Sequence, residues 1–142
     1  MAFKPWHLPL RLATGAYILN SGLSKQDVPD EAAAGMQQMA ANAIPQLGDL
    51  EPKQFATILS TAEVTLGAAL LAIPIVPPLA AGVALTAFSL GLNRLYLKTP
   101  GMTQDSGVKP SEQGIGLAKD IWMTAIGSAL ILDSIFAPRR HR

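Results

Sequence analysis

Apolar residues gather into four long stretches, which polar or proline-rich segments separate. The stretches cover about residues 8–24, 55–76, 79–97 and 115–137. At about 1.5 Å of helix per residue, stretches of this size approach or exceed the roughly 30 Å of a bilayer's hydrocarbon core. The pattern predicts an all-α fold: a four-transmembrane-helix bundle that forms a single membrane domain over residues 1–142.

The segment between the first two stretches has a different character. Residues 30–44 are rich in Ala and Gln and lie between Pro29 and Pro45. Asp30 and Glu31 supply acids to a first helical turn, which favours a helix start there. We therefore expect an additional extramembrane amphipathic helix in the first loop. It lacks the basic polar face of a helix that binds anionic lipid, so it is expected to pack on its own domain.

Composition supports the membrane assignment. Hydrophobic residues make up 49% of the chain, charged residues only 15%, and the mean hydropathy is +0.29. Between Lys53 and Arg94, Glu63 is the single charged residue among forty. High hydrophobicity with little charge excludes intrinsic disorder. A net charge of +1 without a basic run argues against nucleic acid as a partner, and leaves the lipid bilayer.

The distribution of basic residues gives an orientation. Four crossings place both termini and the proline-rich turn at residues 74–78 on one side. The Lys and Arg totals of the two sides are nearly equal, but Arg139, Arg140 and Arg142 cluster at the C-terminus. Because such clusters stay on the cytoplasmic side, we expect a multi-pass protein of the cell membrane with both termini in the cytoplasm.

The residues for self-contained catalysis are missing from the sequence. The chain has no Cys, which excludes thiolate metal ligands and iron–sulfur clusters. Its two histidines, His7 and His141, lie at opposite ends, without the spacing of a metal site. No phosphate-binding glycine loop or serine nucleophile motif occurs. We predict no catalytic residues, no metal and no intrinsic cofactor.

Glu63 is the most conspicuous polar residue of the predicted spans. It lies eight residues past Phe55, so about 12 Å deep in its helix. No Lys or Arg of the other spans is expected at this depth, so we predict an uncharged carboxyl that links helices by a hydrogen bond. The alternative is a carboxyl that faces a proton path or a quinone.

Depth along the spans also predicts interhelical ion pairs. Arg11 and Asp133 lie at similar depths from one face, and a salt bridge between them offsets the cost of burying each charge. Near the other face, Arg94 is expected to pair with Asp120.

The same layer offers a binding alternative. Asn93, Tyr96 and Lys119, together with Arg94, are candidates to contact an anionic head group or substrate anion.

Short motifs carry a resemblance to a known family. In the first stretch they are Arg11, Gly15, Gly22 and Lys25, in the spacing R-x3-G-x6-G-x2-K; EVTLG follows from Glu63 and LAKDIW from Leu117. This arrangement resembles the DoxX-like family of small four-helix membrane proteins. The resemblance covers most of the chain apart from residues 29–50. It implies a link to membrane redox assemblies, to sulfur-compound oxidation through quinone and to oxidative-stress resistance.

Three function hypotheses follow. The first is an accessory or scaffold subunit of a larger membrane assembly, with a respiratory or redox role implied by the resemblance alone. It expects other membrane subunits or self-association as partners, and quinone as a cofactor only through a partner. The second is a quinone-linked oxidoreductase subunit with Glu63 near the quinone. The third, a small-solute or proton transporter, lacks an inverted repeat or a broken helix.

Overall fold

A computed structural model describes residues 4–105 and 107–136. These residues fold into helices and contain no β-strand beyond one isolated bridge between Thr103 and Pro110. The elements are α1 (His7–Leu23), α2 (Asp30–Ala43), the 3-10 helix η1 (Pro45–Asp49), α3 (Pro52–Leu71), α4 (Pro78–Lys98), α5 (Ile115–Ala118) and α6 (Ile121–Phe136). The predicted all-α fold and loop helix are confirmed.

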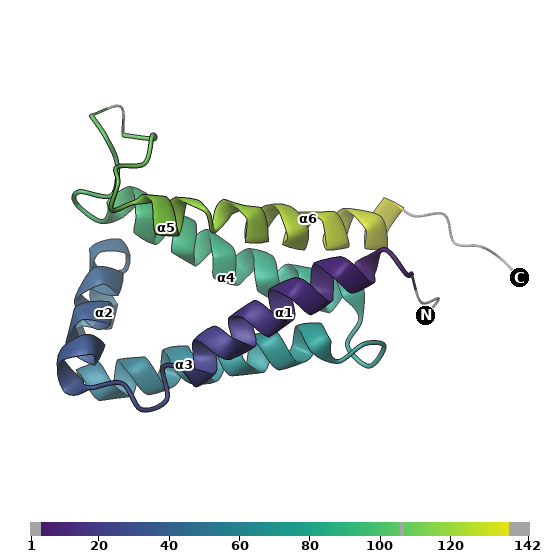
Figure 1. Cartoon of the computed structure of the whole chain (residues 1–142), viewed down its shortest axis with the longest axis horizontal. Coiled ribbons are helices and arrows are strands. Elements are labelled where there is room, and N and C mark those ends of the chain that lie inside the picture. The colour runs from purple at the N-terminus through teal and green to yellow at the C-terminus, as the bar shows by residue number, and fades with distance from the viewer. Residues whose placement is uncertain (1–3, 106, 137–142) are drawn as a thin grey trace, which may run out of the picture.

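The four long apolar helices α1, α3, α4 and α6 run along the bundle, and each is roughly antiparallel to the one before it (Figure 1). The start of α1, the α3–α4 turn and the end of α6 lie together at one end, while α2 lies across the other end. Three helical segments are long and apolar enough to cross a membrane: Pro52–Leu71, Pro78–Lys98 and Ile115–Phe136. α1 has only 17 residues, so a count of four spans stays a prediction. The C-terminal arginine cluster lies outside the described residues.

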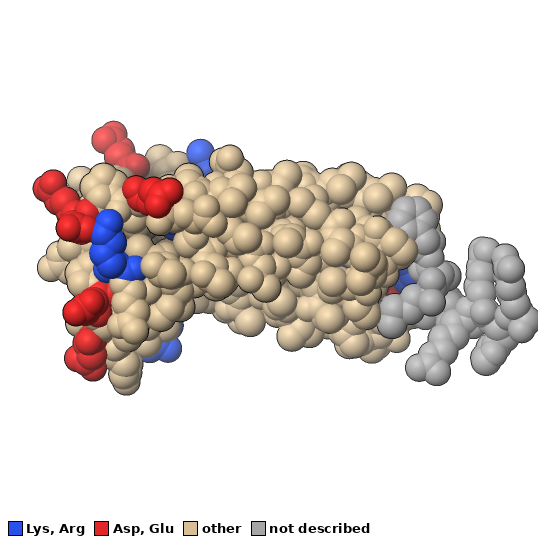
Figure 2. All heavy atoms as spheres, turned by 90° about the horizontal axis from the view of Figure 1, so that it is seen from below, with Lys and Arg blue, Asp and Glu red and all other residues tan. Residues whose placement is uncertain are grey.

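Exposed charged side chains lie towards the ends of the bundle on the face drawn in Figure 2, whereas Glu63 in the middle of α3 is buried. On the face drawn in Figure 2 they gather around the α2 end, and the long middle of the molecule carries none. Large apolar side chains of all four long helices are exposed instead, among them Leu12, Ile58, Val83, Leu90 and Leu132. A surface of this kind fits hydrocarbon better than water.

The bundle consists of two tightly packed helix pairs. α1 packs mainly along α3, and α4 mainly along α6. A Cβ atom added at Gly67 would lie only 2.5 Å from the backbone nitrogen of Leu19, and one at Gly82 2.8 Å from the carbonyl oxygen of Gly127. Glycine therefore sets the close approach within each pair, as small residues do where helices associate in lipid.

Contacts between the two pairs are fewer and involve larger side chains. The shared core contains Ile18 of α1, Leu66 and Leu70 of α3, Ala81 and Leu85 of α4 and Met123 of α6. In Figure 1 the pairs converge towards the chain ends and separate towards α2. The side chain of Gln37 on α2 donates to carbonyls of the following turn, including that of Leu47 at 3.0 Å, and so fixes η1 against α2.

These close approaches lead to a stability prediction. We expect Gly67→Ala to lower the free energy of unfolding by about 1–3 kcal/mol, because its methyl group must push α1 away from α3. Gly91→Ala is the matched control, since a Cβ there meets no atom within 4 Å and alanine favours a helix. Denaturant unfolding in detergent measures both variants. Equal losses would contradict close packing at Gly67.

Candidate functional site

Among the residues that the structure describes, Arg11 is the most deeply buried charged one, with 1% of its surface exposed. Its Nε donates to the carbonyl of Leu70 at 2.9 Å, and Nη2 to that of Ala69 at 2.8 Å. Nη1 donates to the carbonyl of Val76 at 2.9 Å. The last carbonyls of a helix lack partners within it, so the guanidinium closes the end of α3 and holds the following turn.

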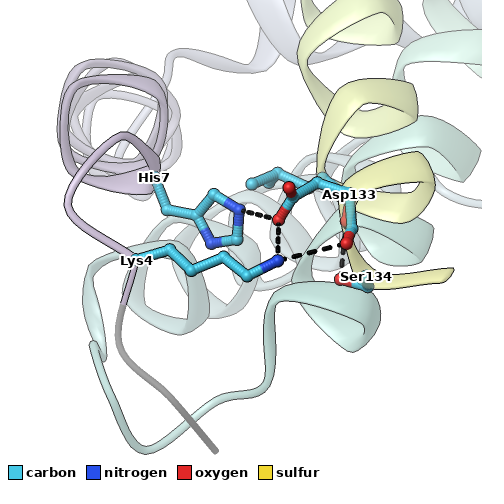
Figure 3. Close-up of polar contacts among 5 residues, drawn as sticks. Lys4, His7, Asp133 and Ser134 are labelled. Atoms are coloured by element: carbon cyan, nitrogen blue, oxygen red, sulfur yellow. Dashed lines mark hydrogen bonds and ion pairs between the residues drawn. The ribbon is translucent and has the colours of Figure 1, made fainter. Parts of the chain in front are cut away.

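The predicted Arg11–Asp133 ion pair is therefore wrong. Asp133 instead accepts two contacts at Oδ2, from Lys4 Nζ at 2.5 Å and from His7 Nε2 at 2.8 Å (Figure 3). Lys4 also donates to the Asp133 backbone carbonyl at 3.2 Å. Equal depth brought Arg11 and Asp133 to one end of the bundle, but the unpaired carbonyls of α3 lie nearer to the guanidinium.

The predicted Arg94–Asp120 pair is also wrong. Arg94 is exposed, and its Nε donates to the carbonyl of Ala43 at the end of α2, at 3.0 Å. The side chain of Asp120 has neither a hydrogen bond nor an ion pair with another described residue. Arg94 thus joins the end of α2 to α4. The sequence alone did not indicate where the loop helix packs on the bundle, so this contact was not predicted.

The three head-group candidates do not form a common site. The Asn93 amide donates to the Thr124 hydroxyl at 2.8 Å, which in turn donates to the hydroxyl of Ser89 at 2.9 Å. The Tyr96 hydroxyl donates to the carbonyl of Val108 at 2.7 Å, and Lys119 is exposed. Asn93 and Tyr96 hold helices and a loop in place.

Glu63 lies in a different setting from the one predicted. It is 5% exposed, and its Oε2 lies 2.8 Å from the Nζ of Lys25. Lys25 belongs to no span but follows α1, and it gives Glu63 a cationic partner that was not predicted from the sequence. Gly22, near the end of α1, lies against Glu63 and Val64, so α1 ends level with the middle of α3 and Lys25 follows within reach.

The Lys25–Glu63 pair borders a cavity between the helices. The cavity has a volume of about 470 Å³ and lies between the helix pairs at the end that α2 covers. Its lining is apolar except for five residues, Tyr17, Ser21, Lys25, Glu63 and Asp120. A cavity of this volume falls within the range of small-molecule sites.

The lining residues come from all six α-helices and from η1. α2 contributes Met36 and Met39, α3 contributes Phe55, α4 contributes Phe88 and α6 contributes Met123. Of the residues that the sequence singled out, Glu63 and Asp120 meet here, on α3 and at the start of α6. Lys25 and the methionines of α2 were missed, because the packing of the loop helix onto the bundle has no signature in a single sequence.

A metal centre has no counterpart in residues 4–105 and 107–136, where no group of three or more His, Cys, Asp or Glu side chains could hold an ion. His141 lies outside these ranges. Comparison with protein-family models, curated proteins and solved structures finds no match to this chain.

Arg11 yields a second stability prediction. Arg11→Met leaves three carbonyls without their donor, and each unsatisfied buried group costs about 1–3 kcal/mol. We expect a loss of about 3 kcal/mol or more in the free energy of unfolding in detergent. Arg94→Met, which removes an exposed guanidinium with one hydrogen bond, is the control and should cost about 1 kcal/mol or less. Similar losses would contradict the role of Arg11 at the end of α3.

Proposed function

We propose that the chain is a multi-pass protein of the cell membrane and serves as an accessory subunit that packs against a transmembrane helix of a larger membrane assembly. The uncharged surface in the middle of the bundle and its charged ends support insertion (Figure 2). The observation that carries the subunit role is an apolar groove on the outer side of the bundle, between α3 and α4.

This groove has a volume of about 620 Å³. α3 and α4 make few direct contacts with each other, since each is paired with another helix. The residues that line the groove are mostly small or β-branched: Thr57, Ile58, Thr61, Ala62, Thr65, Leu66, Ala69, Ala84 and Phe88. The lining thus offers an apolar surface formed by small and branched side chains of α3 and α4.

The spacing on α3 favours a helix as the occupant. Thr57, Thr61, Thr65 and Ala69 recur every four residues and so form one stripe along the helix. The hydroxyls of Thr57 and Thr61 donate to the carbonyls four residues earlier, at 2.9 and 2.8 Å. These two hydroxyls are therefore satisfied within α3, and stripes of small residues let two transmembrane helices approach closely.

A redox role of the assembly is supported only by the resemblance to the DoxX-like family. In that case quinone would belong to the partner, since the groove contains no ionisable side chain to deliver a proton. The interpretation as an accessory subunit needs no chemistry from this chain. It needs a partner helix.

Site-specific crosslinking tests the docking site. A photoreactive amino acid at Thr61 should give one discrete heavier adduct in intact membranes, because the partner helix lies on that residue. The same substitution at Leu132, an exposed apolar residue of α6, is the control and should give none. Adducts of equal yield at both positions, or a Thr61 adduct that contains only a second copy of this chain, would overturn the accessory role.

Orientation can be measured separately, because a chain without Cys accepts single cysteine probes. Ile75 is 84% exposed in the α3–α4 turn, and Gln104 lies in the loop at the opposite end. With cytoplasmic termini, Gln104→Cys should react with an impermeant maleimide in intact cells, and Ile75→Cys only after the cells are opened. The reverse pattern would place the termini outside.

A further inference from the structure

The charges around the cavity between the helix pairs do not balance. Its charged lining residues are Lys25, Glu63 and Asp120. With both carboxylates ionised, one ammonium faces two negative groups. An apolar cavity screens charge poorly, so the excess negative charge strongly affects what binds there.

Lys25 is not available to neutralise Asp120. An ammonium group has three N–H donors, and the described contacts of Lys25 engage three acceptors. Nζ donates to Glu63 Oε2 at 2.8 Å, to the Ser21 hydroxyl at 2.6 Å and to the Ser21 carbonyl at 3.1 Å.

The other nearby cations do not reach the cavity either. Arg94 donates to Ala43 and Lys119 is exposed, and neither lines the cavity. Glu63, the other acid of the lining, carries a charge of the same sign as an Asp120 carboxylate. The Asp120 carboxylate is thus the unmatched charge of the site.

We propose that this cavity binds a monovalent organic cation with an apolar body, such as a lipophilic ammonium or phosphonium ion. One added positive charge beside Asp120 brings the site to neutrality. The apolar lining accommodates the body, and the rings of Tyr17, Phe55 and Phe88 offer faces that attract a cation. Anions are repelled by the excess carboxylate, and a neutral amphiphile leaves it unmatched.

The lining also suits ligands of varied shape. Met36, Met39 and Met123 line the cavity from α2 and α6, and methionine adapts to irregular surfaces because its side chain is unbranched and polarisable. We therefore expect a preference for charge and hydrophobicity rather than for one molecular outline. This cavity is a separate space from the proposed docking groove on the outer side of α3 and α4, although Phe88 lines both.

The test compares two probes of nearly equal shape. Methyltriphenylphosphonium carries one positive charge, and triphenylphosphine oxide is its neutral counterpart. We expect the full chain in lipid nanodiscs to bind the phosphonium saturably and at least tenfold more tightly than the oxide, as measured by calorimetry. Equal affinities would overturn the proposal and favour a neutral ligand such as a quinone. The absence of saturable phosphonium binding would also overturn it.

Substitutions identify the charge responsible. Asp120→Asn should weaken phosphonium binding at least tenfold, and Asp120→Glu should retain it. Asp105→Asn removes an exposed carboxylate from the loop and should have no effect. Because the Asp120 side chain makes no hydrogen bond within the described chain, Asp120→Asn is expected to fold, and thermal unfolding checks this. Unchanged affinity in a folded Asp120→Asn variant would contradict the assignment.

Discussion

The guanidinium of Arg11 fixes the end of the bundle where the chain termini lie. It donates hydrogen bonds to two carbonyls in the last turn of α3 and to one in the turn that leads into α4. One side chain of α1 therefore determines where α3 ends and from which point α4 begins. The contact of Lys4 and His7 with Asp133 adds α6 to the same end (Figure 3). All four bundle helices are held together there, and the pairs converge.

At the opposite end of the bundle, α2 packs across the helices. The Ser60 hydroxyl donates to the carbonyl of Gly22 at 2.8 Å, so the last turn of α1 lies beside the middle of α3. The first two turns of α3 continue past α1, and α2 packs on them instead. α2 crosses the bundle rather than running along it (Figure 1), and a cavity lined by residues such as Met39 of α2 and Phe55 of α3 remains beneath it.

These features explain which sequence predictions held. Helix positions followed from apolar length and proline boundaries, and α2 begins at the predicted Asp30. The ion pairs failed because depth was counted along each span as if all spans began at common levels. α1 ends partway along α3, which brings Lys25 to Glu63. The predictions also paired each charged side chain only with another charged side chain. Arg11 and Arg94 instead both donate to backbone carbonyls.

The proposed partner helix and the proposed cation bear on the same part of the molecule. Glu63 lies on the inner side of α3, between Thr61 and Thr65 of the outer stripe. Phe88 of α4 lines both the cavity and the groove, so its ring forms part of the wall between them. A shift of Phe88 that enlarges one space reduces the other, since packed side chains leave little free volume. The proposed partner helix and the proposed cation would therefore both contact Phe88.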